Sequence, residues 1–200
     1  MSGRQSTVRR SQSSRMTAAR YRVRSPQTLS DAERRIVVLW AADCADHVLP
    51  LFETITGDGR PRAAIAGARA FARGELQVWP TRSLAGHAHA AARDAAGQAA
   101  AAAAARAAGH AAATAHMGAH ALGAAAYAAK AAGLASMKRQ DAVAEEIRRQ
   151  LALLSPAARA ALRQLPIVGA PKAGPIGPGL LASGKLGVVV AELQTRLAEA

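Results

Sequence analysis

Two histidines, His116 and His120, stand four residues apart in a stretch (109–133) that is otherwise almost wholly alanine and glycine. On an α-helix this spacing places both imidazoles on one face, as in the histidine pairs that bind zinc. The helical metalloprotease motif also needs a glutamate directly after the first histidine, and Met117 occupies that position. Asp43 or His47 of the first predicted helix, or His87 of the third, could complete the set of ligands. One hypothesis is therefore a divalent-metal site made by Asp43, His116 and His120.

The alternative is a polar cluster that fills gaps between small-residue helices and binds no metal. In such a cluster each buried imidazole is satisfied by hydrogen bonds to neighbouring side chains or carbonyl groups. We favour this second interpretation and therefore expect no cofactor. The candidate members of the cluster are Asp43, His47, His87, His116, His120 and Tyr127.

Two further histidines are expected to lie outside this cluster. His110 is rotated away from the histidine pair by more than a quarter of a helical turn. His89 follows His87 by two residues, which places it about 200° away on the helix, on the side of Arg82 and Arg93.

Helical periodicity predicts the elements that would position these residues. Ser30 followed by Glu33 is the pattern of a capping box, which starts a helix by satisfying its first backbone donors. Apolar residues then recur at helical spacing, and they do so again in 61–73 and in 81–97. The segment that follows Ser30 and the segments 61–73 and 81–97 are each predicted to form an amphipathic helix.

The segment 98–134 is helical in pattern throughout and has the alanine content that most favours helix. As one helix it would be about 55 Å long, which is long for a domain of this size. We therefore expect a break near Gly109 or at Met117–Gly118. The predicted fold class is all-α, a compact bundle of about five helices.

Composition divides the chain into five parts. Two of these parts, a leader and a linker, are recognised by their biased composition. Serine and arginine dominate the first residues, and proline and glycine are frequent near the end of the chain. The predicted parts are a disordered Ser/Arg-rich leader (1–29), a helical domain (30–136), a helical extension (137–165), a Pro/Gly-rich linker (166–183) and an amphipathic C-terminal helix (184–200).

The formal net charge of +13 is unevenly distributed. Residues 1–29 hold seven arginines and no acid, whereas residues 30–136 hold ten basic and eight acidic side chains. A basic leader could make weak, non-specific contacts with nucleic acid. The sequence shows no secretory signal and no convincing membrane span, so we expect a cytoplasmic protein. It also lacks the GxxxxGK[ST] phosphate loop.

Four stretches in order resemble a known family: WAADCADHVLPLFE, RPRAAIAGARAFARGE, AHAAARDA and AARAAGHAAATAHMGAHALGAAAYAAKAA. They are similar to the Imm-5-like putative immunity proteins of bacteria over about residues 30–136. The resemblance implies an all-α protein that neutralises a bacterial toxin by binding it, and that is not an enzyme.

This resemblance leaves the binding surface open. The arginine face made by Arg62, Arg69 and Arg73 is most simply a solvated face, and the alternative is that it contacts an acidic partner. We expect the specificity of toxin binding to lie on exposed helix faces and in the TGDGR loop. A small-residue helix face could also support a homodimer. The alternatives are a metal-dependent helical-bundle enzyme that uses the Asp43, His116 and His120 site, and a DNA-associated protein that acts through its basic leader.

Overall fold

The computed structural model describes residues 25–199, and every regular element in that range is a helix. The predicted all-α class is confirmed, with more helices than the expected five or so. The predicted leader up to residue 24 lies outside the described residues. The helices are α1 (Asp31–Val48), α2 (Pro50–Glu53), α3 (Arg60–Arg73), α4 (Val78–Asp94), α5 (Ala99–Ala113), α6 (His120–Ala135), α7 (Arg139–Ala152), α8 (Pro156–Arg163), the 3-10 helix η1 (Leu180–Ala182) and α9 (Gly184–Glu199).

The predicted capping box starts α1. The Ser30 hydroxyl accepts a hydrogen bond from the Glu33 backbone N–H at 3.2 Å, and the Glu33 carboxylate accepts one from the Ser30 N–H at 2.7 Å. At the end of α3, Gly74 adopts a φ of 83°, the left-handed conformation that glycine reaches without strain. Local sequence therefore determines where these two helices begin and end.

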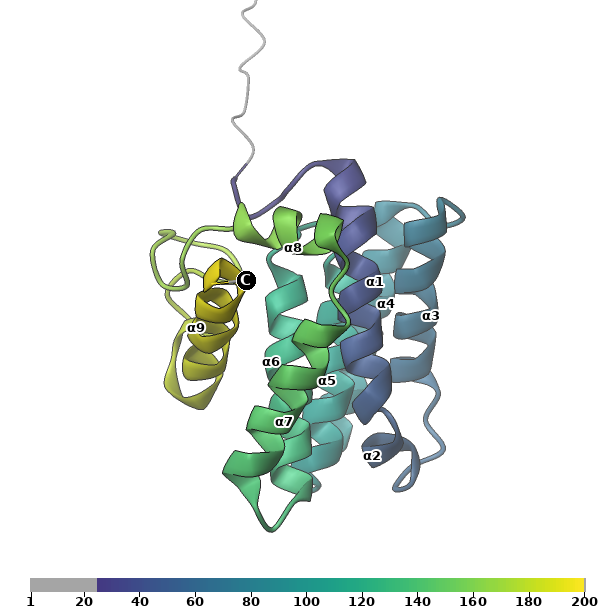
Figure 1. Cartoon of the computed structure of the whole chain (residues 1–200). Coiled ribbons are helices and arrows are strands. Elements are labelled where there is room, and N and C mark those ends of the chain that lie inside the picture. Colours follow the sequence, from purple (N-terminus) through teal and green to yellow (C-terminus); the bar gives the residue numbers. More distant parts are fainter. Residues whose placement is uncertain (1–24, 200) are drawn as a thin grey trace, which may run out of the picture.

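Helix α5 occupies the centre of the bundle. It contacts α1, α2, α3, α4 and α6, and Figure 1 shows it behind α1 with α4 beside it. Ten of its residues are buried, and all ten are alanine or glycine. Side chains this small allow helix axes to approach closely, so that the interior fills without many large residues. Phe52, Phe71 and Leu122 are among the larger side chains that complete the core.

The predicted break in the long alanine segment is at 114–119, where the chain reverses between α5 and α6. The backbone N–H of Gly118 donates to the Thr28 carbonyl at 3.1 Å, and that of Ala119 donates to the Gln27 carbonyl at 3.0 Å. A β-carbon at Gly118 would lie 2.5 Å from the Leu29 side chain. Glycine is therefore required for the segment before α1 to pack on this reversal.

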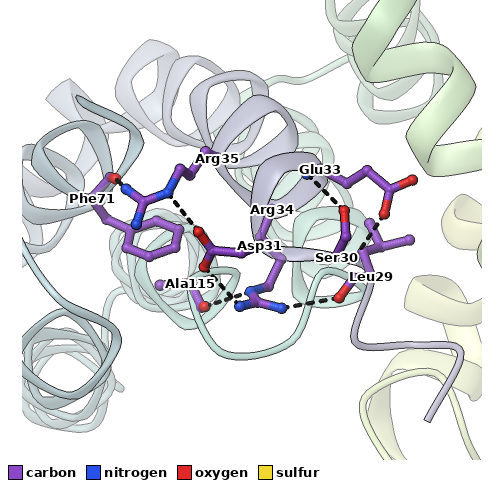
Figure 2. Close-up of polar contacts among 8 residues, drawn as sticks. All are labelled: Leu29, Ser30, Asp31, Glu33, Arg34, Arg35, Phe71 and Ala115. Carbon is purple, nitrogen blue, oxygen red and sulfur yellow. Dashed lines mark hydrogen bonds and ion pairs between the residues drawn. The ribbon is translucent and has the colours of Figure 1, made fainter. Parts of the chain in front are cut away.

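A buried guanidinium fixes the same reversal to α1 (Figure 2). Arg34 is 6% exposed; its Nε donates to the Ala115 carbonyl at 2.9 Å and its Nη1 to the Leu29 carbonyl at 3.0 Å. Its Nη2 pairs with Asp31 at 3.0 Å. One side chain therefore satisfies two carbonyl groups that come from different segments of the chain.

Asp31 extends this network to α3. Its second oxygen accepts a hydrogen bond from Arg35 Nε at 2.8 Å. The Arg35 guanidinium lies 4.5 Å from the centre of the Phe71 ring and donates to the Phe71 carbonyl (Figure 2). Consecutive arginines thus connect α1 to two neighbours, the α5–α6 reversal and α3.

The predicted Pro/Gly-rich linker and the last residues of the predicted leader pack on each other. Gln27 is 2% exposed; its Nε2 donates to the Ala173 carbonyl at 2.6 Å, and its Oε1 accepts from the Ile176 N–H at 3.1 Å. Ile176 and Leu29 are buried as well. Within the described range, 25–29 and 166–183 are therefore packed parts of the fold, although their composition predicts a leader and a linker.

We predict that Arg34→Met destabilises the protein. The substitution keeps an apolar stem but leaves the Leu29 and Ala115 carbonyls without their charged donor, which costs roughly 2–4 kcal/mol. Urea unfolding should show a lower midpoint with an unchanged slope. Arg62→Met, at an exposed ion pair, is the matched control and should leave the midpoint nearly unchanged. Equal midpoints for the two variants would contradict the role assigned to Arg34.

Candidate functional site

Five rings from α4, α5, α6 and the α5–α6 reversal meet in one histidine cluster, formed by His89, His110, His116, His120 and Tyr127. His110 is central: its ring centre lies 5.2 Å from those of His89, His120 and Tyr127. The His116 and His120 rings are 5.0 Å apart. The Nδ1 atoms of His110 and His120 are 3.1 Å apart, so one of them donates and the other accepts.

Two glycines make room for these rings. A β-carbon on Gly109 of α5 would lie 2.6 Å from the His89 ring, and one on Gly123 of α6 would lie 2.6 Å from His110 Nδ1. The imidazoles therefore lie directly against helix backbones. Most residues of this segment are alanine. At Gly109 and Gly123 the β-carbon is absent, and a histidine ring occupies the space that an alanine methyl group would take.

Burial lowers the pKa of every histidine in the cluster. Desolvation is the main cause, and it brings the pKa of His120 down to about 3 and that of His110 well below its ordinary value. The pKa values of His89 and His116 are lowered for the same reason, with nearby arginines adding to the effect. The four imidazoles are thus neutral at neutral pH. Among residues 25–199, the buried Nδ1 atoms of His89 and His116 find no hydrogen-bond partner.

A basic rim surrounds the cluster, formed by Arg82 and Arg93 of α4, Arg106 of α5 and Lys130 of α6. Arg82 contributes to the lowered pKa of His116 and His120, while Arg106 acts on the pKa values of His89 and His110. The Lys130 ammonium lies 5.7 Å from the centre of the Tyr127 ring. The four positive charges therefore lie around a group of neutral rings.

The acidic side chains of residues 30–136 all form bonds with residues outside the basic rim. Seven of the eight acidic side chains in 30–136 form ion pairs with arginines of α1 or α3, and the eighth, Glu33, bonds Ser30 and Gln164. Among residues 25–199, no carboxylate pairs with a residue of the basic rim. Opposite charges are therefore matched around α1 and α3, while the α4–α6 face keeps an excess of positive charge.

The predicted metal ligands are not brought together. His116 and His120 are neighbours, but the Asp43 carboxylate pairs with Arg69 of α3 at 2.9 Å. Within residues 25–199, no group of three or more histidine, cysteine, aspartate or glutamate side chains is arranged to hold a metal ion. The histidine pair instead bonds and stacks with other rings, as a polar cluster between helices does.

The other predicted cluster members have different positions. His47 of α1 contacts α7 instead of the histidine cluster. Its Nδ1 is 2.7 Å from the buried carboxylate of Glu146 in α7. Arg149 and Gln150 also donate to Glu146, so the group holds α7 against α1. His87 is exposed on α4. Of the predicted cluster, His116, His120 and Tyr127 are the members that meet.

The structure corrects the expectation for two histidines. His89 and His110 belong to the cluster although the helical phase of each, taken separately, placed them outside it. The reversal explains the difference, because His110 is in the last turn of α5 and His120 is the first residue of α6. Two residues within one turn of a helix reversal can contact each other across it. The predicted break at Met117–Gly118 therefore already indicated that His110 and His120 could meet.

Each arginine of the predicted partner face already has an acidic partner. Arg62 pairs with Glu53 at 2.6 Å, Arg73 with Glu75 at 2.7 Å, and Arg69 with both Asp43 and Asp46. The predicted stripe exists on α3, but its charges are matched within the chain.

We predict that protonation of the histidine cluster destabilises the fold. The unfolded chain binds a proton at His120 below its ordinary pKa of 6.5, whereas the folded protein does so only near a pKa of about 3. Stability is therefore fully present above pH 6.5 and falls by up to about 1.4 kcal/mol per pH unit below it for this one group.

Urea unfolding at a series of pH values between about 6.5 and 4 measures this slope. His120→Asn removes the titrating ring and should make the slope shallower. His87→Asn removes an exposed histidine from the same bundle and is the matched control. If the two variants gave the same slope, the assigned proton linkage of His120 would be wrong.

Comparison with known proteins agrees with the sequence resemblance. The family described as Imm-5 like putative immunity protein matches residues 27–157, which span α1 to the start of α8. No curated protein and no solved structure matches the chain. No helix in the described range is long and apolar enough to cross a membrane. The match covers well over half of the chain, and the protein therefore belongs to the Imm-5 like putative immunity protein family.

Proposed function

We propose that the protein is an immunity-type protein that neutralises a bacterial toxin by binding it, and that the contact is made through the histidine cluster and its basic rim. Family membership supports the immunity function. The observation that carries the choice of surface is the charge distribution. Asp94 is the one acidic residue on α4, α5 and α6 and it pairs with Arg60 of α3, and the four cations of the rim have no carboxylate partner in the described chain.

Unpaired cations favour an acidic partner. A carboxylate that approaches the rim gains a charge-assisted hydrogen bond, and no existing pair has to be broken for it. Arginine also binds carboxylates through two parallel hydrogen bonds, which adds geometric specificity. The Arg62, Arg69 and Arg73 face is less suited to this contact, because each of its arginines would first have to leave an acid.

The histidine cluster adds neutral polar groups inside this positive rim. His89 and His116 are half-buried, so their neutral rings add partly exposed polar surface inside the rim, while their buried Nδ1 atoms face no partner in the described part of the chain. Trp79, which is 73% exposed and lies under Arg82 at 5.0 Å, provides an aromatic surface at the same face. Arginine and tryptophan are the residue types that most often dominate protein interfaces.

Growth rescue tests the function. Candidate toxin domains from the bacterium that carries the gene are expressed one at a time, with and without this chain. We expect the chain to restore growth with one toxin and to form a stable complex with that toxin after purification. If the chain restores growth with no candidate toxin and binds none, the immunity function is wrong.

Paired charge reversals test the surface. Arg82→Glu with Arg93→Glu should weaken toxin binding by about tenfold or more, because both unpaired cations are replaced by repelling charges. Arg62→Glu with Arg73→Glu makes the same change in net charge on α3 and is the matched control. If the control pair weakens binding more than the rim pair, the toxin binds at another surface even though the immunity function stands.

A further inference from the structure

A second concave site lies between the end of α6, the start of α7 and the length of α9. It is a groove of about 850 Å³ whose apolar lining includes Leu134, Val143, Ile147, Val188 and Val189. Val188 is 70% exposed, so this apolar lining faces solvent. Figure 1 shows α9 beside α6, on the side of α6 away from α1. The volume is within the range of small-molecule sites, roughly 300–1,000 Å³.

Three of the four positive charges that line the groove gather at one end, and the fourth, Arg196, lies towards the end of α9. Arg163 of α8 donates to the Leu197 carbonyl at 2.6 Å, so the end of α9 lies beside α8, which follows the end of α7. The starts of α7 and α9 therefore share the opposite end of the groove, together with the end of α6. Lys130, Arg139 and Lys185 line the groove from these three helix ends.

This charged end lacks a carboxylate. Glu192 is the acidic residue among those that line the groove, and its carboxylate accepts a hydrogen bond from Arg196 at 2.6 Å, one turn further along α9. In residues 25–199, Lys130, Arg139 and Lys185 form no ion pair. The groove thus combines an apolar length with an unmatched positive end.

We propose that this groove binds an anionic single-chain amphiphile such as a fatty acid. The carboxylate would lie among Lys130, Arg139 and Lys185, and the hydrocarbon chain would cover Val143, Val188 and Val189. The lining of α9 runs from Gly184 to Arg196, which is about 18 Å at 1.5 Å per residue. An extended acyl chain buries apolar surface along the part of this length that Val188 and Val189 line.

The charge arrangement favours this ligand over an acidic amphipathic helix. A helix in a groove places its charged residues along both edges of its apolar face, whereas the unpaired cations here lie at one end. The proposal does not rest on the immunity function, because it is argued from the lining of the groove alone. The α6 and α7 part of that lining lies inside the family match and the α9 part lies outside it, and Lys130 is the residue that the groove shares with the basic rim.

Calorimetric titration of the full chain tests the ligand class with three probes. Laurate should bind with one site per chain. Dodecyltrimethylammonium, whose hydrocarbon chain is about one carbon longer and whose charge is opposite, should bind about tenfold more weakly or not at all. An acidic amphipathic peptide is the third probe. Equal binding of the two amphiphiles, binding of neither, or binding of the peptide alone would each overturn the proposal.

Single substitutions locate the site. Val188→Glu places a carboxylate on the exposed apolar lining, and Lys185→Glu reverses one of the head-group charges. Each should weaken laurate binding by about tenfold or more. Ile167→Glu and Lys172→Glu make the same changes at exposed positions that do not line the groove, and they should bind laurate as the wild type does. Unfolding midpoints equal to that of the wild type would show that Val188→Glu and Lys185→Glu still fold. If laurate binds to the groove variants and their controls equally, the groove is not the site.

Discussion

Close approach of small-residue helices is the constraint on which the rest of this structure depends. Helix α5 lies against five other helices and presents only alanine and glycine in its buried surface. Alanine contributes little apolar area, so the free energy of folding has to come from dense packing and from satisfied polar groups. This makes the α5–α6 reversal critical, because it is the point at which two such helices are joined. The bonds of Arg34 to Ala115 and Leu29 hold that reversal against α1.

The same constraint explains why histidines gather in the bundle. Two of the rings lie in the alanine-packed interface where a glycine leaves room, His89 beside Gly109 and His110 beside Gly123. Once enclosed, the imidazoles lose hydration, and burial lowers their pKa values. Helix packing therefore encloses the rings, and this enclosure keeps the imidazoles neutral.

Sequence reasoning predicted the features that depend on local pattern. The capping box at Ser30 and the all-α class follow from residue types within a few positions of each other. Of the two positions predicted for the break, Met117–Gly118 is where it lies, whereas α5 continues through Gly109. Sequence reasoning did not predict the partners of Asp43 or His110, because helical phase fixes the angle of a side chain on its own helix but not the rotation of that helix against its neighbours. The packed 25–29 and 166–183 segments were missed for a related reason. Their order comes from contacts between distant residues, such as Gln27 with Ala173 and Ile176.

The neutral imidazoles also explain how the basic rim can exist. Arg82, Arg93 and Arg106 each lie close enough to the cluster to lower a histidine pKa, so a protonated cluster would add like charges beside them. Burial keeps the rings neutral and prevents that repulsion. Ion pairing of the acids with α1 and α3 then leaves the rim unmatched. The positive charge of the α4–α6 face is thus maintained by two separate features, the desolvated rings inside the rim and the scarcity of acids on these helices, where Asp94 is the one carboxylate and pairs with Arg60 of α3.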